Sequence, residues 1–469
     1  MQKIAQLDHE YVWHPFTQMK DWLREEPIVI TRGKGVTIWD SRGRKYLDAN
    51  SSIWTNLHGH AHPKMNRAIN AQLKKIAHSS ALGLANEPAA LLAERLIKSN
   101  KVGENGPTKV FFSDDGSTAM EVALKLSYEY WRRTGVSKPR FLSMEGAYHG
   151  DTVGAVSLGH VDLFHRAFKN LLFETDSAPA PYCYRCPHNK AEPQRADARS
   201  YRKCDFECVT AVEKKFSEAN RSGKRITGFV VEPLMQGAAG MIAQPEGWLT
   251  RVCQIARNYR AHVIADEVMT GFGRVTDPAK GLFAMQQEDL AADFVAVAKG
   301  LTGGYLPMAA TLTTRPVFEA FLGEYEEFKT FFHGHSYTGN QLGASAALAS
   351  LGLLQSRQSL AERTKLATRF DRGLQRLWKH PNVGDMRRVG LVAGIELVRN
   401  WRTREAFELR ERVGIRVCNA MTKRGVLTRP IGNVIVLMPP YCTPAHELAK
   451  MIGALEESLF EVLPAESLS

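Results

Sequence analysis

The segment Val263-Ile264-Ala265-Asp266-Glu267-Val268 is an apolar run that closes on an acid, and Thr270-Gly271-Phe272-Gly273-Arg274 follows it. A short apolar run bounded by an acid and glycines is typical of a buried strand. An aspartate that closes such a strand lies at the carboxyl edge of the sheet, where open α/β sheets bind ligands. Asp266 is therefore a candidate ligand-binding residue. A helix cap or a turn residue is an equal interpretation of this fragment alone.

A lysine closes the next apolar run, Ala296-Val297-Ala298-Lys299-Gly300-Leu301-Thr302-Gly303-Gly304-Tyr305. Desolvation at the end of a buried strand lowers the pKa of a lysine and favours the free amine that attacks a carbonyl carbon. Lys299 is therefore a candidate nucleophile. The alternative is a lysine whose stem lies on the protein while its charge reaches solvent.

The segment Ser113-Asp114-Asp115-Gly116-Ser117-Thr118 marks a strand that breaks at glycine and continues as a helix. Free backbone N–H groups and the positive helix end make such a junction a phosphate site, with Gly116 and Ser117 as its candidates. We predict that Thr118 and Glu121 form the capping box of this helix. The alternative is an ordinary strand-to-helix turn.

A fourth segment, Ala147-Tyr148-His149-Gly150-Asp151-Thr152, offers an aromatic ring and polar groups in a loop directly after a strand. Alone it indicates little. A phosphate cradle, an acid, an amine and an aromatic plate at the strand ends of one α/β unit together suit pyridoxal 5′-phosphate. The lysine would form the Schiff base, and the aspartate would hold the pyridinium proton so that the ring serves as an electron sink.

The middle of the chain alternates short apolar runs with longer helical patterns, which predicts a mainly parallel sheet flanked by helices. The ends differ, because residues 1–62 mix short strands with turns and the chain beyond about residue 340 holds long helices. We therefore expect a PLP-binding large domain at 63–336 and a smaller α+β domain built from 1–62 and 337–469. The predicted central strands are Lys109–Ser113, Arg140–Met144, Ile226–Val231, His262–Ala265, Phe294–Ala298 and Met308–Thr313.

The chain has 469 residues, of which 44% are hydrophobic and 23% charged, and this mix excludes wholesale disorder. No window approaches the ~18–20 uninterrupted apolar residues of a membrane helix, and the first residues lack the basic and apolar regions of a signal peptide. We expect a cytoplasmic protein with no membrane partner. The net charge of +12 is spread along the chain, so we expect no nucleic-acid partner and an attraction for small anions.

Seven cysteines are few for this length, and their odd number argues against a disulfide framework. Four of them cluster as Cys183 with Cys186 and Cys204 with Cys208. The first pair has zinc-ligand spacing, whereas the second is one residue wider than in the usual zinc ribbon. We expect no metal site and keep zinc at these four cysteines as the alternative.

The combination of D-E-V-x-x-G-F-G-R at Asp266–Arg274 with a lysine 33 residues beyond Asp266 resembles the class III (omega) aminotransferases. The similarity runs over essentially the whole chain, and it implies the type I PLP-dependent fold with a seven-stranded sheet. Within that family the chain is most similar to the branch that converts 8-amino-7-oxononanoate to 7,8-diaminononanoate in biotin synthesis. The residues that carry this likeness are Trp13–Met19, Ser51–Trp54, Tyr148–Thr152, His333–Asn340, Thr428–Pro430 and Leu437–Pro440.

The resemblance implies a role for each matching residue. Lys299 would be the Schiff-base lysine and proton shuttle, and Asp266 would pair with the pyridine nitrogen. Gly334 and Arg429 would meet the oxononanoate, with the guanidinium taking its distal carboxylate. The others would bind the cofactor: Gly116 and Ser117 at the phosphate, Tyr148 against the ring, and His335 and Ser336 at the phosphate of the neighbouring subunit in a homodimer.

One position argues against the 4-aminobutyrate and ornithine aminotransferases of the family. They have an arginine for the substrate carboxylate seven residues after the position of Arg429, where this chain has Val436. A buried carboxylate needs a partner, and Arg429 is the one that remains. A class III aminotransferase for another ω-amine is the runner-up.

The sequence leaves two amino donors open, because Ile53, Phe16 and Val436 stand where many relatives of this branch have aromatic residues. Those aromatics line the space used by S-adenosylmethionine, whose sulfonium suits aromatic faces. We expect S-adenosylmethionine as the donor, with Ile53 at the substrate site, and keep L-lysine as the alternative.

Overall fold

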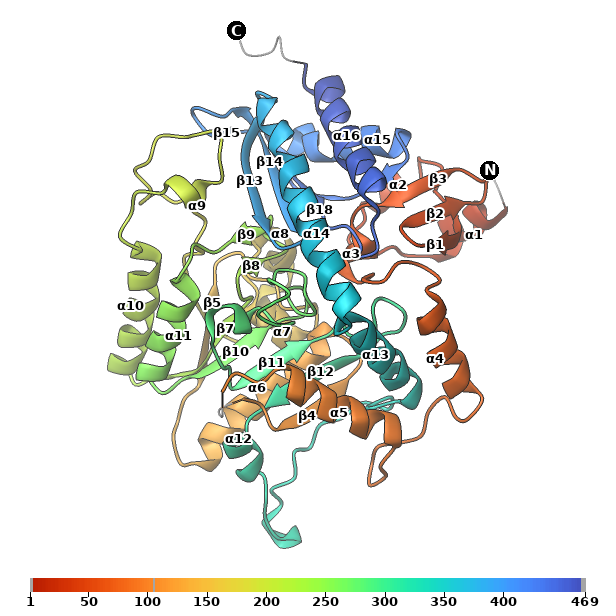
Figure 1. Ribbon diagram of the computed structural model, residues 1–469. Coiled ribbons are helices and arrows are strands. Elements are labelled where there is room, and N and C mark those ends of the chain that lie inside the picture. The colour runs from red at the N-terminus through yellow and green to blue at the C-terminus, as the bar shows by residue number, and fades with distance from the viewer. Residues whose placement is uncertain (1–2, 104–105, 465–469) are drawn as a thin grey trace.

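The computed structural model describes residues 3–103 and 106–464, with one seven-stranded sheet at its centre (Figure 1). Neighbouring strands are parallel except where β12 pairs with β11 and with β4. The predicted mainly parallel sheet is confirmed. In spatial order its strands are β4 (Lys109–Ser113), β12 (Ala309–Thr313), β11 (Phe294–Val297), β10 (His262–Asp266), β7 (Ile226–Val231), β5 (Arg140–Met144) and β6 (Asp176–Ala178).

Helices cover both faces of this sheet, so its central strands are apolar at successive positions. Alternate residues of a strand point to opposite faces. Ile264 and Phe294 therefore pack into a cluster with helix α6 (Gly116–Arg133), whereas Val263 and Val295 belong to the larger cluster on the other side. Helices that contribute to the larger cluster include α10 (Glu207–Arg221) and α11 (Trp248–Asn258).

The six predicted central strands are confirmed to within one residue at each end. Strand β6 was not predicted, because its three residues Asp176, Ser177 and Ala178 have no apolar alternation. Parallel pairing with β5 alone makes it an edge strand of the sheet.

The predicted capping box of Thr118 and Glu121 is wrong. The helix begins at Gly116, so Asp115 is its N-cap, and the Asp115 carboxylate accepts a hydrogen bond from the Thr118 N–H at 3.0 Å. The Thr118 hydroxyl accepts in return from the Asp115 N–H at 3.0 Å. Glu121 instead accepts from the Gly154 N–H at 2.8 Å and ties α6 to the following loop.

The two ends of the chain share a four-stranded sheet, in which β16 pairs in parallel with β3 (Figure 1). The prediction that both termini build the smaller α+β part is confirmed. The boundaries at residues 62 and 336 stay predictions. The four strands are β1 (Ile30–Lys34), β2 (Thr37–Asp40), β3 (Lys45–Asp48) and β16 (Val426–Leu427).

A second C-terminal sheet runs β13-β14-β18-β17, with β15 paired to β14. Helix α14 packs on α16, and α16 packs on α15. The strands are β13 (Val383–Val389), β14 (Val392–Asn400), β15 (Glu405–Ala406), β17 (Pro430–Ile431) and β18 (Val434–Leu437), and the helices are α14 (Arg357–Leu374), α15 (Val413–Lys423) and α16 (Ala445–Val462).

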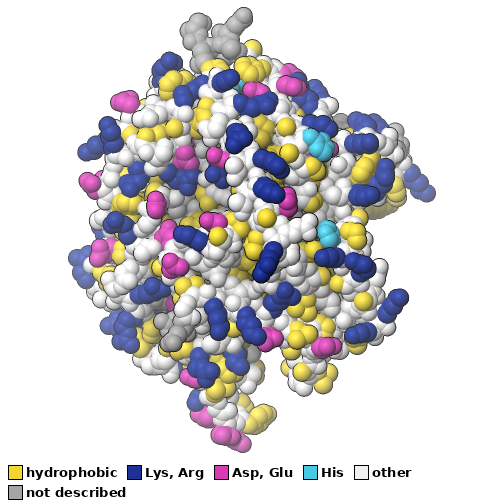
Figure 2. Space-filling model, in the orientation of Figure 1, with side chains coloured by type: hydrophobic (Ala, Val, Ile, Leu, Met, Phe, Trp, Pro, Cys, Tyr) yellow, Lys and Arg dark blue, Asp and Glu magenta, His cyan; other side chains and the backbone are white. Residues whose placement is uncertain are grey.

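The remaining elements are shorter or connect these layers. In the ranges 3–103 and 106–464, no helix is both long and apolar enough to cross a membrane. On the face drawn in Figure 2, lysine and arginine side chains are scattered among acidic and apolar ones. The connecting elements are α1 (Lys3–Tyr11), α2 (Met19–Trp22), α3 (Ser51–Trp54), α4 (Pro63–Leu73), α5 (Glu87–Ser99), α7 (Val153–Leu158), α8 (Asp162–His165), α9 (Ala198–Tyr201), α12 (Arg315–Glu319), α13 (Gln341–Leu354), and strands β8 (Met235–Gln236) and β9 (Ile242–Ala243).

Candidate active site

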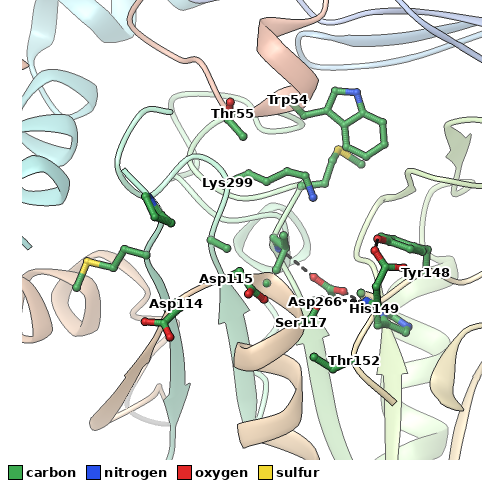
Figure 3. A pocket seen from close by; sticks show the side chains of 18 of the residues that line it. Trp54, Thr55, Asp114, Asp115, Ser117, Tyr148, His149, Thr152, Asp266 and Lys299 are labelled. Atoms are coloured by element: carbon green, nitrogen blue, oxygen red, sulfur yellow. Dashed lines mark hydrogen bonds and ion pairs between the residues drawn. The ribbon is translucent and has the colours of Figure 1, made fainter. Parts of the chain in front are cut away.

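A cavity of about 740 Å³ opens where β10 and β11 end and α6 begins (Figure 3). This is the carboxyl edge of the parallel strands, where the sequence predicted a ligand site. Five of the predicted residues line it: Gly116, Ser117, Tyr148, Asp266 and Lys299.

Asp266 is the last residue of β10 and is almost fully buried. One carboxylate oxygen lies 2.7 Å from Nδ1 of the buried His149, and the other accepts from the Val268 N–H at 3.0 Å. Burial opposes protonation of the His149 imidazole, but the hydrogen bond and charge of Asp266 outweigh it and raise the pKa of His149. A protonated His149 would donate to the Asp266 carboxylate and keep it oriented toward the cavity.

Lys299 follows β11 by two residues, and its side chain points across the cavity toward the indole of Trp54 (Figure 3). Nζ lies 5.4 Å from the centroid of that indole. Burial lowers the pKa of the Lys299 amine, while the charges of Asp266 and Glu232 oppose the shift. This environment favours a free amine, as the sequence analysis expected.

The junction of β4 and α6 has the features of a phosphate cradle. The Ser117 hydroxyl accepts from the Asp151 N–H at 3.0 Å, so two loops meet at the start of α6. Gly150 has φ +126°, and a Cβ there would lie 2.1 Å from the Ser117 hydroxyl, so only glycine fits. The Thr152 hydroxyl lines the cavity, is buried, and has no partner among the described residues. An anion at this helix end would accept from these groups.

Tyr148 forms one wall of the cavity. Its hydroxyl donates to an Asp151 carboxylate oxygen at 2.7 Å. Burial, and then this hydrogen bond, raise the pKa of the Tyr148 phenol, so the ring stays neutral. Phe16 packs edge-on against the Tyr148 ring, with centroids 6.4 Å apart.

Glu232 also lines the cavity, and the sequence analysis did not single it out. Burial raises the pKa of its carboxyl to about 7, although the charge of His149 acts to lower it. The carboxyl accepts from the Gly237 N–H at 2.8 Å and from the Tyr148 N–H at 3.4 Å. The sequence does carry a pattern that indicates Glu232, because this residue follows the apolar run of β7 just as Asp266 closes β10.

The other predicted site residues do not line the cavity. His335 comes nearest, with Nδ1 3.6 Å from a carboxylate oxygen of Asp114, which does line it. Arg429 is exposed and makes no hydrogen bond or ion pair within the described part of the chain. The residues outside the lining are Ile53, Gly334, His335, Ser336 and Arg429, and their functions stay predictions.

The clustered cysteines give the zinc alternative no support. Cys183, Cys186, Cys204 and Cys208 are all free thiols. Burial raises the pKa of the Cys183 thiol to about 12 and that of Cys208 to about 11. Across residues 3–103 and 106–464, no group of three or more His, Cys, Asp or Glu side chains is arranged to hold a metal ion.

The family model for "Aminotransferase class-III" matches residues 19–459. The chain belongs to this family. Adenosylmethionine-8-amino-7-oxononanoate aminotransferase of Geobacter sulfurreducens is 46% identical over 462 residues, which cover 98% of each chain. The enzyme of the same name from Aquifex aeolicus is 44% identical, over 98% of this chain and 97% of the relative.

Solved structures of class III aminotransferases and omega transaminases have the same fold. The crystal structure of adenosylmethionine-8-amino-7-oxononanoate aminotransferase from Methanocaldococcus jannaschii matches with a TM-score of 0.89 at 38% identity, over 98% of both chains. An omega transaminase from Pseudomonas jessenii in complex with PMP also matches with a TM-score of 0.89, at 25% identity over 98% of both chains.

Pyridoxal 5′-phosphate is the cofactor of this class III aminotransferase, as the sequence predicted. The residues of the cavity fit it. The start of α6 and the unpartnered Thr152 hydroxyl can meet its phosphate, and Asp266 offers an oriented carboxylate for its ring nitrogen. Lys299 supplies the one lysine amine in the described lining.

Proposed function

We propose that this class III aminotransferase transfers an amino group from S-adenosylmethionine to 8-amino-7-oxononanoate, giving 7,8-diaminononanoate for biotin synthesis. The observation that carries this proposal is the 46% identity, over 98% of each chain, to a relative named for that reaction. The cavity with Lys299 and Asp266 supplies the groups that transamination requires.

The proposed chemistry assigns a task to each buried group. Bound pyridoxal phosphate supplies an electron sink for the substrate carbon next to nitrogen. Asp266 holds a proton on the cofactor ring nitrogen, and His149 keeps the Asp266 carboxylate in place. Lys299 carries a proton to and from the substrate carbon with its free amine. Tyr148, which lines the cavity, would lie against the cofactor ring.

The charge of the cavity supports an acceptor whose carboxylate is remote from the reacting carbon. No arginine is among the described residues that line it. Val436 is buried in a cluster with Met269 and Trp54 rather than open to substrate. Arg429, which is exposed and has no hydrogen bond or ion pair among the described residues, remains for the distal carboxylate of 8-amino-7-oxononanoate.

We further propose a cytoplasmic homodimer whose active sites are shared. Large apolar side chains are exposed around the loop that bears His335 and Ser336, and burial against a second copy would stabilise them. Examples are Phe332, 73% exposed, and Tyr337, 61% exposed. All seven cysteines lie in the described part of the chain as free thiols, in keeping with a reducing compartment. Light scattering of the purified protein should give twice the chain mass of 52.3 kDa.

A half-reaction tests the proposed function. S-adenosylmethionine is added to one sample of the PLP-loaded protein and L-lysine to another, and the visible absorbance of the cofactor is followed. We expect S-adenosylmethionine to convert the cofactor to its amine form, and 8-amino-7-oxononanoate to restore the starting spectrum. Conversion by lysine alone would replace the donor, and conversion by neither would overturn the substrate assignment.

A further inference from the structure

The segment before the cavity wall is a left-handed turn without glycine. Ser51, Ser52, Ile53 and Trp54 have φ angles of 47°, 49°, 61° and 72°. Residues with side chains adopt this conformation singly and at a cost, and a β-branched residue such as Ile53 adopts it least readily. Such a run persists only where its surroundings hold it.

The small domain holds the first half of this turn. Asp48, at the end of β3, accepts from the Ser52 N–H and from the Ser52 hydroxyl, each at 2.8 Å. The Ser51 hydroxyl donates to the Met438 carbonyl at 2.6 Å, which links the turn to the C-terminal segment.

Arg274 holds the second half from the large domain. Its fully buried guanidinium donates to the carbonyls of Trp54 at 3.4 Å, Asn56 at 2.9 Å and Pro439 at 3.1 Å. Within the described residues it forms no ion pair with a carboxylate, and its charged face lies over the Tyr441 ring, 5.0 Å from the centroid. A buried cation that binds only carbonyls is costly unless it fixes those carbonyls in place.

The side chain that this arrangement presents to the cavity is Trp54 (Figure 3). Its indole lies over Nζ of Lys299 at 5.4 Å, and its Nε1–H is buried without a partner among the described residues. Gly237 leaves room for it, since a Cβ there would lie 3.2 Å from the indole. A small rotation of the turn would move the indole off Lys299.

We propose that Arg274 is a positioning residue that fixes the left-handed turn and thereby sets the Trp54 indole against Lys299 and the bound substrate. The effect on substrate rests on the proposed function, whereas the position of the indole does not. Lysine in place of Arg274 keeps the charge but cannot donate to carbonyls on two segments through a planar fork.

A double-mutant cycle on the PLP-loaded protein tests this. Arg274→Lys and Trp54→Phe are compared singly and combined, by kcat and KM for the amino donor and by visible circular dichroism of the cofactor. We expect each single variant to raise the donor KM by up to about 10-fold, the value of one aromatic contact. The double variant should lie within about 2-fold of either one, because both changes remove the same contact.

Arg363→Lys is the matched control. Arg363 is a second buried guanidinium over the same Tyr441 ring, at 5.5 Å, but it donates to the Leu354 carbonyl and not to the turn. It should lower the melting temperature as much as Arg274→Lys while leaving the donor KM and the dichroism unchanged. Ser52→Ala, which loosens the turn from its other end, should shift the dichroism in the same direction as Arg274→Lys.

Effects of Arg274→Lys and Trp54→Phe that multiply in the double variant would overturn the proposal. So would an Arg363→Lys variant that reproduces the Arg274→Lys spectrum. If Arg274→Lys does not fold, an unchanged dichroism in Trp54→Phe would overturn the proposal, because the indole would then have no influence on the cofactor. The dichroism needs no substrate, so a wild-type protein inactive toward S-adenosylmethionine would refute the proposed function and leave this test intact.

Discussion

The cavity draws its residues from two regions of opposite character. Asp266 and Lys299 stand at the ends of regular, buried strands whose backbone is fully paired in the sheet. Trp54 stands on a left-handed turn that costs roughly 1–2 kcal/mol per residue, and side chains of other segments reinforce the turn's own backbone hydrogen bonds. The reacting groups thus come from the most regular part of the fold, and the group that faces them comes from a strained one.

This difference suggests a division of labour. The sheet edge fixes atoms whose displacement would stop the reaction, since proton transfer needs hydrogen-bond geometry. The turn and the loops around it lie at the rim, and Ile53, Phe16 and Arg429 are all exposed there or on similar segments. Substitutions at the sheet edge should therefore cost far more activity than those on the turn and loops.

The largest effect is expected from Lys299→Met. It removes the amine that binds the cofactor and moves the proton, so kcat should fall by at least about 10⁴-fold. The matched control is Lys138→Met, because burial lowers the pKa of the Lys138 amine to about 8 and Trp131 covers it, yet it lies outside the cavity. Steady-state rates measure kcat for both variants. Equal losses of kcat would contradict the claim that the lysine in the cavity has a catalytic role that the buried lysine outside it lacks.

Asp266→Asn should lower kcat on the order of 10²–10³-fold, because a neutral amide cannot hold a proton on the ring nitrogen by charge. Asp293→Asn is its control at the opposite edge of the same strands, where Asp293 accepts from the Val263 N–H at 2.7 Å. That variant should lose stability and keep its kcat. Similar kcat values for the two variants would contradict the claim that only the acid at the carboxyl edge of the strands takes part in catalysis.

Glu232→Gln should change the pH dependence of stability. The carboxyl has a pKa of about 7 in the folded chain against an ordinary 4.5, so folding favours its protonated form. Its contribution to stability is full below pH 4.5 and is lost as pH rises to about 7, on the order of 3 kcal/mol. The melting temperature of the cofactor-free variant should rise relative to that of the cofactor-free wild type between pH 5 and pH 8. A constant difference in melting temperature over this range would contradict a raised pKa for the Glu232 carboxyl.

The smallest effect is expected at the exposed rim. Phe16 is 61% exposed and meets the rings of Tyr148 and Phe164 edge-on. Phe16→Ala should raise the donor KM about 2- to 10-fold, the value of one aromatic contact, with kcat nearly unchanged. A loss of kcat as large as that of Asp266→Asn would mean that the rim takes part in the chemistry.

The sequence predicted the sheet edge well because its signals are local. An apolar run that ends in Asp266 or Lys299 is readable from a few residues, and the glycine at 116 marks the helix start. The same rule applied to the run before Glu232 would have found that residue too. Registry and burial then follow from the parallel pairing of the strands.

The turn could not be predicted, because its cause is distant in the sequence. Ser51-Ser52-Ile53-Trp54 contains no glycine or asparagine to announce positive φ angles, and the groups that impose them are Asp48, Arg274 and Met438. The resemblance to the family placed Ile53, Phe16 and Val436 together at the donor site. In the structure Ile53 is an exposed turn residue, Phe16 packs on Tyr148, and Val436 is buried in a cluster with Trp54, so their part in donor binding stays a prediction.

Reductive trapping tests the central claim most directly. The PLP-loaded protein is treated with borohydride, which fixes the cofactor to the lysine that binds it, and the labelled peptide is identified by mass spectrometry. We expect stoichiometric label on Lys299 and a stable, colourless product without activity. Label on Lys138 or on any other lysine, with Lys299 unmodified, would contradict the assignment of the cavity as the active site.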